Sequence, residues 1–183
     1  MSLEGIDLTL ALWDYDAVSA PLVSRSKSVG GRRLIASLGR QLGGRVEPYL
    51  QPSTVVTWVP PSPHGLRRRG FDQGRVLATS TAKQIGSDTY PAFTRSGRAQ
   101  FGGDRARRLQ GPRMVVRPDW RARPPTDQVV LVDDVITTGS TMAVAARLLR
   151  AEHPRLDVVA VAVAARQIGQ RSVDTGVPRV GWG

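Results

Sequence analysis

Two adjacent carboxylates followed by a run of hydroxyl side chains form the stretch of this sequence best suited to chemistry. Residues 129–142 read VVLVDDVITTGSTM, in which an apolar strand leads into Asp133 and Asp134, and the turn 137–141 leads into a helix. Carboxylates only accept hydrogen bonds, so this pair suits the hydroxyls of a sugar or a cation bound beside them. The hydroxyls of the turn can donate to phosphate oxygens, and Gly139 lets the backbone approach a phosphate closely.

The position of this turn between a strand and a helix also favours an anion. Sheets of the α/β class bind ligands at the carboxyl ends of their strands, and the N-terminus of the following helix offers free backbone N–H groups. Other phosphate motifs do not fit, because a P-loop needs a lysine after its second glycine and a dinucleotide-binding turn needs three spaced glycines. A plain helix cap needs a single hydroxyl, whereas several follow the acidic pair here. The sequence therefore predicts a phosphate-binding loop.

Alternating strand and helix patterns surround this loop and predict the elements that position it. Apolar spacing predicts helices over 31–43, over 75–85 with a start near Asp72, and over 140–152. Apolar and β-branched runs predict strands over 54–59, 128–132 and 157–164, with a small strand over 114–117. Arginine and glycine dominate residues 94–112, for which we expect a long mobile loop. The predicted fold is of the α/β class, with a mostly parallel twisted sheet flanked by helices.

The composition of the 183-residue chain limits its chemistry and its partners. Cysteine is absent, which excludes disulfides, thiolate zinc sites and cysteine nucleophiles, and fits a cytoplasmic protein. The longest apolar runs are too short to cross a bilayer, so we expect no membrane association. The formal net charge of +11 attracts polyanions, yet no nucleic-acid-binding motif accompanies it. We therefore expect nucleic acid to bind weakly and non-specifically at most.

The acidic pair and the turn after it resemble the phosphoribosyl pyrophosphate (PRPP) motif of type I phosphoribosyltransferases. The resemblance implies that Asp133 and Asp134 are the catalytic residues and bind the ribose 2- and 3-hydroxyls of PRPP. It also implies a cradle for the 5-phosphate of PRPP, formed by Ile136, Thr137, Thr138, Gly139, Ser140 and Thr141. The implied fold is that of a type I phosphoribosyltransferase with a mobile hood loop, in which Arg98 and Arg105 would close over the substrate.

A second stretch, residues 58–77, reads WVPPSPHGLRRRGFDQGRVL and resembles the competence-protein ComF family. The usual family text is close to RERGFNQA, so Asp72 stands in the place of an asparagine and Gly74 in that of an alanine. The equivalent loop of type I phosphoribosyltransferases contacts the pyrophosphate of PRPP. The resemblance thus assigns to the pyrophosphate side Pro60, Pro61 and Arg69, the last because it directly precedes Gly70.

The likeness to ComF proteins covers roughly residues 12–166, most of the chain. Lys27 falls at the family's lysine position, which leaves open whether it contacts pyrophosphate or lies on the surface. Many ComF-like proteins begin with a four-cysteine zinc module, and this chain has none. We expect a single domain over 1–168, with 1–26 as its entry segment, followed by a tail over 169–183.

Together the resemblances imply an enzyme that transfers the phosphoribosyl group of PRPP to a nitrogen nucleophile and releases pyrophosphate. Mg²⁺ is the implied cofactor, held mainly by PRPP and through water by Asp133 or Asp134 rather than by direct protein ligands. An alternative is a non-catalytic PRPP-binding protein associated with nucleic acid in DNA uptake. The sequence leaves open the identity of the acceptor and whether the protein forms a homodimer.

Overall fold

The computed structural model describes residues 3–26, 28–95, 114–122, 126–166 and 173–174. Its centre is a six-stranded sheet in the order β3-β2-β6-β7-β1-β8, in which all neighbouring strands are parallel. The strands are β1 (Leu8–Asp14), β2 (Thr54–Trp58), β3 (Asp88–Thr89), β6 (Gln128–Ile136), β7 (Asp157–Ala165) and β8 (Val173–Asp174). The predicted α/β class with a mostly parallel sheet is confirmed.

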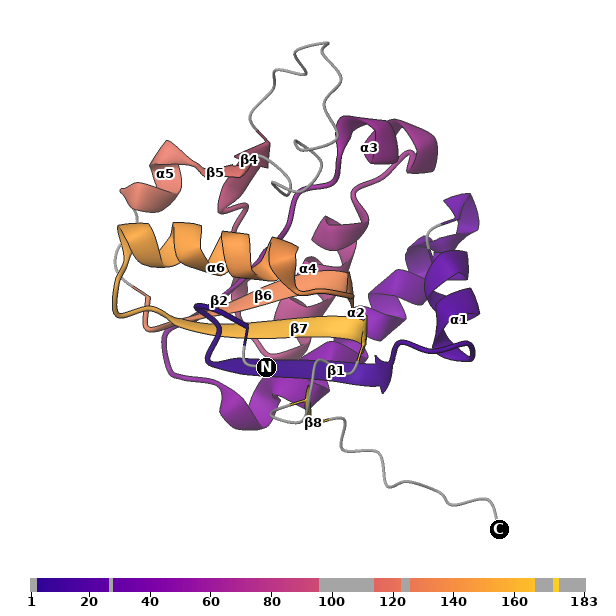
Figure 1. Ribbon diagram of the computed structural model, residues 1–183, viewed down its shortest axis with the longest axis horizontal. Coiled ribbons are helices and arrows are strands. Elements are labelled where there is room, and N and C mark those ends of the chain that lie inside the picture. Colours follow the sequence, from indigo (N-terminus) through magenta and orange to yellow (C-terminus); the bar gives the residue numbers. More distant parts are fainter. Residues whose placement is uncertain (1–2, 27, 96–113, 123–125, 167–172, 175–183) are drawn as a thin grey trace.

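Helices cover both faces of this sheet (Figure 1). On one face lies α6 (Ser140–Glu152), and on the other lie α2 (Arg32–Val46) and α4 (Gln73–Gln84), with α1 (Ser19–Ser26) beside α2. The remaining helices are α3 (Pro63–Arg69), α5 (Pro118–Arg121) and two short 3-10 helices, Val29–Gly31 and Glu47–Tyr49. No helix in the described part of the chain combines the length and apolarity that crossing a membrane requires.

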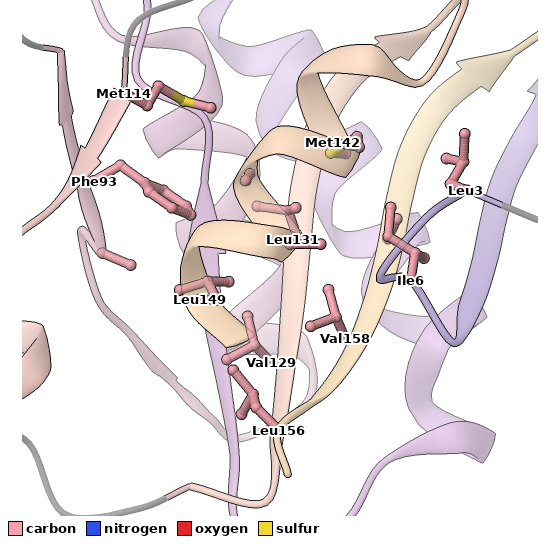
Figure 2. Packing of buried hydrophobic residues seen from close by; sticks show 14 of the residues in the cluster. Leu3, Ile6, Phe93, Met114, Val129, Leu131, Met142, Leu149, Leu156 and Val158 are labelled. Carbon is pink, nitrogen blue, oxygen red and sulfur yellow. The ribbon is translucent and has the colours of Figure 1, made fainter. Parts of the chain in front are cut away.

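Alternation along the central strands divides the core into two clusters. On β6, Val129 and Leu131 pack on the α6 side, while Val130 and Val132 belong to the cluster with α2 and α4. Figure 2 shows the α6 side, where Leu149 and Met142 of the helix lie over the sheet, with Phe93 and Met114 on one flank and Leu3 and Ile6 on the other. Both faces of the sheet are apolar, as expected of parallel strands covered by helices.

The structure contains elements that sequence patterns did not predict. Residues 8–14 form β1, and α1, β3 and β8 are also additional. The loop predicted over 94–112 starts later than expected, because Thr94 and Arg95 belong to β4 (Phe93–Arg95), which pairs antiparallel with β5 (Met114–Val116). The remainder of that loop, with Arg98 and Arg105, lies outside the described residues.

Helix α3 lies within residues 58–77, where the sequence patterns predicted a helix only from near Asp72. Ser62 caps α3, because its hydroxyl accepts a hydrogen bond from the Gly65 N–H at 3.0 Å. Pro63 occupies the first turn, where its missing N–H costs nothing, and Gly70 ends the helix in the left-handed region at φ 73°. Arg67, Arg68 and Arg69 therefore lie on a short helix.

Strand β6 is longer than predicted, and this extension places the acidic pair. The sequence predicts its end at Val132, but pairing with β7 continues to Ile136, which lies opposite Ala165. Strand β2 ends with Trp58 opposite Val132, so Asp133 and Asp134 project past the end of β2. The chain turns from β2 toward α4 on one face and from β6 toward α6 on the other. Such a reversal opens a crevice at the carboxyl ends of two neighbouring strands.

Candidate functional site

A cavity of about 220 Å³ occupies the crevice between the carboxyl ends of β2 and β6. It is lined by Val59, Pro60, Pro61, Ser62, Arg69, Gln73, Gly74, Arg95, Asp133, Asp134 and Thr141. The structure therefore brings together the predicted acidic pair and the predicted pyrophosphate-side residues Pro60, Pro61 and Arg69. These residues are far apart in the sequence and meet only because β2 and β6 are neighbours in the sheet.

The acidic pair forms one wall of the cavity. Both carboxylates are half-buried, and Asp133 Oδ1 accepts a hydrogen bond from the Asp134 N–H at 2.8 Å. This bond fixes the orientation of the Asp133 carboxylate within β6. Both groups can accept hydrogen bonds from sugar hydroxyls or from the water shell of a cation.

The predicted phosphate loop lies at the N-terminus of α6. Gly139 is buried and caps the helix in the left-handed region at φ 73°, a conformation that a residue with a β-carbon rarely adopts. Thr137, Thr138 and Ser140 are exposed, and the Thr138 and Ser140 hydroxyl oxygens lie 2.9 Å apart in a hydrogen bond. The first N–H groups of a helix have no partner within it, so this loop combines hydroxyl and backbone donors with the positive end of the helix dipole.

Two residues predicted for the phosphate cradle occupy different positions. Thr141 lines the cavity and joins the loop to the acidic wall. The Ile136 side chain is only 1% exposed and packs in the core, while its carbonyl accepts a hydrogen bond from the Arg166 N–H. Among the predicted cradle residues, Thr141 is thus the one that shares the cavity with Asp133 and Asp134.

Arg69 reaches the cavity from the last turn of α3. Its Nε atom is buried and has no hydrogen-bond partner among the described residues. Arg67 and Arg68 of the same helix are exposed. A buried guanidinium N–H without a partner is costly, and a bound anion would satisfy it.

Arg95 is a cavity residue that sequence reasoning placed in the loop rather than in the site. It ends β4, and its Nε donates to the Pro60 carbonyl at 2.9 Å. Burial lowers the pKa of the Arg95 guanidinium, and the nearby Asp133 carboxylate opposes this shift by favouring the charged form. The signal available in the sequence was the aromatic and β-branched pair Phe93-Thr94, which favours a strand, directly before Arg95.

Gln73 was also missed, although it belongs to the predicted RRRGFDQG run. Its side chain is 3% exposed, lines the cavity and donates from Nε2 to the Ser26 hydroxyl at 3.4 Å. Ser26 is the last residue of α1, so this contact ties the N-terminal helix to the site. Lys27, the next residue, was predicted for the pyrophosphate side and lies outside the described residues.

A family model identifies the chain on grounds independent of this geometry. The model described as "Phosphoribosyl transferase domain" matches residues 73–181, more than half of the chain. The chain belongs to the phosphoribosyltransferase domain family. The matched residues of this phosphoribosyltransferase domain include the acidic pair, the hydroxyl loop and the cavity residues Gln73, Gly74 and Arg95.

Solved structures similar to this phosphoribosyltransferase domain include an adenine phosphoribosyltransferase, 16% identical, which covers 75% of this chain and 71% of that chain with a TM-score of 0.47. An orotate phosphoribosyltransferase from Aeropyrum pernix is 22% identical over 76% of this chain and 62% of that chain, with a TM-score of 0.44. The allosteric regulatory enzyme of purine biosynthesis is 23% identical over 68% of this chain, with a TM-score of 0.44. The chain spans a quarter of the length of that enzyme. No curated protein matches the chain by sequence.

The donor atoms of the cavity fit a metal that arrives with its ligand. Among the described residues, no group of three or more histidine, cysteine, aspartate or glutamate side chains could hold a metal ion by itself. Asp133 and Asp134 nevertheless supply carboxylate oxygens, which are the ligands that Mg²⁺ prefers and which it often binds through water. These two carboxylates can therefore contribute to binding a divalent cation whose other ligands come from water or from a bound molecule.

Proposed function

We propose that the protein is a Mg²⁺-dependent phosphoribosyltransferase that binds PRPP, transfers its phosphoribosyl group to a nitrogen nucleophile and releases pyrophosphate. The observation that carries the proposal is the cavity in which the acidic pair, Asp133 and Asp134, shares one space with Arg69 and Arg95. A ligand that combines sugar hydroxyls with phosphate groups fits both pairs, because its hydroxyls can donate hydrogen bonds to the carboxylates and its phosphate oxygens can accept them from the two guanidinium groups. The family match supports the reaction class.

The proposed binding mode follows from the donors and acceptors along the site. The carboxylates of Asp133 and Asp134 accept hydrogen bonds from the ribose hydroxyls, while the exposed hydroxyls and free N–H groups at the start of α6 bind the 5-phosphate. Arg69 and Arg95 bind the pyrophosphate, since guanidinium groups make paired hydrogen bonds with phosphate oxygens. The loop 59–62 supports them, because the Pro60 carbonyl holds Arg95.

In the proposed reaction, the bond between C1 of the ribose and the pyrophosphate oxygen breaks, and a bond from C1 to the nucleophile nitrogen forms. Positive charge develops on the ribose and negative charge on the departing pyrophosphate. Arg69 and Arg95 stabilise the leaving group, and Asp133 and Asp134 stabilise the ribose from the opposite wall. Mg²⁺, when bound with PRPP, supplies further neutralisation of the pyrophosphate charge. The nitrogen nucleophile also loses a proton, and no side chain is assigned as the general base that accepts it.

Within the family, we propose that the protein belongs with the ComF-like members. Support comes from the RRRGFDQG run, which the structure distributes over the end of α3, the Gly70 turn and the start of α4. Arg69, Gln73 and Gly74 of this run all line the cavity. The run therefore contributes to the site through both of its ends.

Pyrophosphate release tests the proposal directly. The purified protein is incubated with Mg²⁺, PRPP and a panel of amines and nucleobases, and the control is the double variant Asp133→Asn/Asp134→Asn. We expect acceptor-dependent release by the wild-type protein and none by the variant. PRPP binding without release for every acceptor would instead support the non-catalytic alternative, and failure of the wild-type protein to bind PRPP would contradict both.

A further inference from the structure

Asp72 uses its two carboxylate oxygens for two different partners. Its Oδ1 accepts a hydrogen bond from the Arg75 N–H at 3.0 Å and so caps α4. Its Oδ2 accepts a hydrogen bond from the Trp58 indole Nε1–H, also at 3.0 Å. Trp58 is the last residue of β2 and is only 8% exposed, while Asp72 is half-buried, so this second bond is partly shielded from water.

The bond between Trp58 and Asp72 joins two walls of the cavity. Residues 59–62 follow Trp58 directly, and Gln73 and Gly74 follow Asp72 directly, and both segments line the cavity. Neither Trp58 nor Asp72 lines it. Their bond therefore acts on the site only through the wall segments that it holds together.

Gly74 brings the two walls into close contact. A β-carbon at this position would lie 2.9 Å from Trp58 Cδ1 and 3.2 Å from the Val59 carbonyl oxygen, both closer than side chains normally pack. The indole of Trp58 therefore occupies the space that a β-carbon on residue 74 would fill. The start of α4 can approach the end of β2 only with glycine at this position.

Asp72 and Gly74 are also two of the three positions at which the RRRGFDQG run departs from the usual ComF text, the third being the exposed Arg68. An asparagine has one side-chain oxygen, so it can cap α4 or accept from the indole but cannot do both in this geometry. An alanine at position 74 would displace the indole. Both departures are explained by the same neighbour, Trp58.

We propose that Trp58, Asp72 and Gly74 form a clamp that sets the separation of the two cavity walls and thereby the affinity for the pyrophosphate group. The inference rests on the proposed function, because it assigns the clamped end of the cavity to pyrophosphate. Asp72 is a positioning residue here and does not touch the ligand. The clamp holds the Pro60 carbonyl, and through it Arg95, at a fixed distance from the start of α4.

Two substitutions separate the clamp from the helix cap. Asp72→Ser retains an acceptor for the Arg75 N–H, since serine caps helices about as well as aspartate, but its short side chain loses the indole. Trp58→Phe removes the indole donor and leaves the cap intact. We expect each variant to bind inorganic pyrophosphate in the presence of Mg²⁺ at least about fivefold more weakly than wild type by titration calorimetry.

The double variant completes the test. Because both substitutions break the same bond, Trp58→Phe/Asp72→Ser should bind pyrophosphate about as well as either single variant. The thermal midpoint of Asp72→Ser should stay within about 4 °C of wild type, which excludes a loss of the cap as the cause. Trp120→Phe is the matched control, since this buried tryptophan has an Nε1 without a partner among the described residues and lies outside the cavity.

Three results would overturn the clamp. The first is unchanged pyrophosphate affinity in Asp72→Ser, which would leave the carboxylate only its capping role. The second is additive losses in the double variant, which would show that the two residues act separately. The third is a comparable loss in Trp120→Phe. If the wild-type protein itself binds neither pyrophosphate nor PRPP, the proposed function fails and the positioning role fails with it.

Discussion

The guanidinium of Arg69 lies over Gly65, one helical turn earlier in α3. A β-carbon on Gly65 would stand 2.8 Å from Arg69 Nη2 and 3.3 Å from Cζ. The same β-carbon would lie 3.0 Å from the capping hydroxyl of Ser62. The absence of a side chain at position 65 therefore lets the guanidinium lie along the helix with its Nε buried beside the cavity.

Gly65→Ala should displace the Arg69 guanidinium while leaving the fold intact. Alanine favours a helix, so the change acts on the flexible end of the arginine rather than on the backbone. We expect pyrophosphate affinity to fall by roughly three- to tenfold in calorimetry, less than the full loss of a charge-assisted hydrogen bond, because the guanidinium is displaced rather than removed. Gly44→Ala in α2 is the matched control, because a β-carbon there meets nothing within 4 Å. Equal affinity in the two variants would argue against a ligand role for Arg69.

Asp133→Asn and Asp134→Asn should each weaken Mg²⁺-PRPP binding. A carboxylate that accepts from a ribose hydroxyl makes a charge-assisted bond worth roughly 1.5–3 kcal/mol, or about 10- to 100-fold in affinity. Titration calorimetry measures the change. Asp127→Asn removes the same charge from the residue that precedes β6, at the opposite end of the strand, and should leave affinity unchanged. An equal loss of affinity in all three variants would show that Asp133 and Asp134 act only through the net charge of the protein and not through contacts with PRPP.

Pyrophosphate binding should depend on both the charge of Arg95 and the planar shape of its guanidinium group. Arg95→Gln removes the charge, and Arg95→Lys keeps it but loses the Nε bond to the Pro60 carbonyl. We expect both to weaken pyrophosphate binding, with glutamine the more damaging by roughly tenfold, since hydrogen bonds to charged groups are the stronger ones. Arg121→Gln, which removes an exposed arginine paired with Glu152, serves as the control. Full affinity in Arg95→Lys would show that only the charge matters.

Gly139→Ala should destabilise the protein more than an ordinary substitution at positive φ. Alanine in the left-handed region costs about 1–2 kcal/mol, and here its β-carbon would also overlap the buried Leu3 side chain. Gly86→Ala measures the first cost alone, because Gly86 has φ 65° and open space around it. Chemical denaturation should show a larger loss at 139 than at 86. The difference should shrink in the Leu3→Ala background, and if it does not, Leu3 does not restrain the loop.

Nucleic acid should bind weakly and without sequence preference despite the net charge of +11. Binding driven by arginine–phosphate contacts releases counterions, so affinity should fall steeply between about 50 and 200 mM salt. Fluorescence anisotropy with single- and double-stranded oligonucleotides of different sequence measures this dependence. Sub-micromolar, sequence-selective binding at physiological salt would favour the DNA-uptake alternative.

The acidic pair and the hydroxyl loop could be predicted because their signals are contiguous. An apolar strand, two carboxylates, a hydroxyl-rich turn and an amphipathic helix follow one another within residues 129–152, and local chain geometry then fixes their order. The helix over 63–69 had local signals too, in the capping Ser62, Pro63 in the first turn and the terminal Gly70. The apolar spacing used to predict the other helices is absent from this short, arginine-rich segment, which is why it was not predicted.

Sequence by itself thus determined the fold class, the parallel character of the sheet and one wall of the site, since these depend on hydrophobic period and short-range turn chemistry. The family resemblance also assigned Pro60, Pro61 and Arg69 to the other wall, and tertiary structure decided that Arg95 and Gln73 join them. Only the neighbouring positions of β2 and β6 bring Arg95 and Gln73 to Asp133. The bond from Trp58 to Asp72 likewise spans a helix and two turns. Such contacts depend on long-range pairing, which no local pattern encodes.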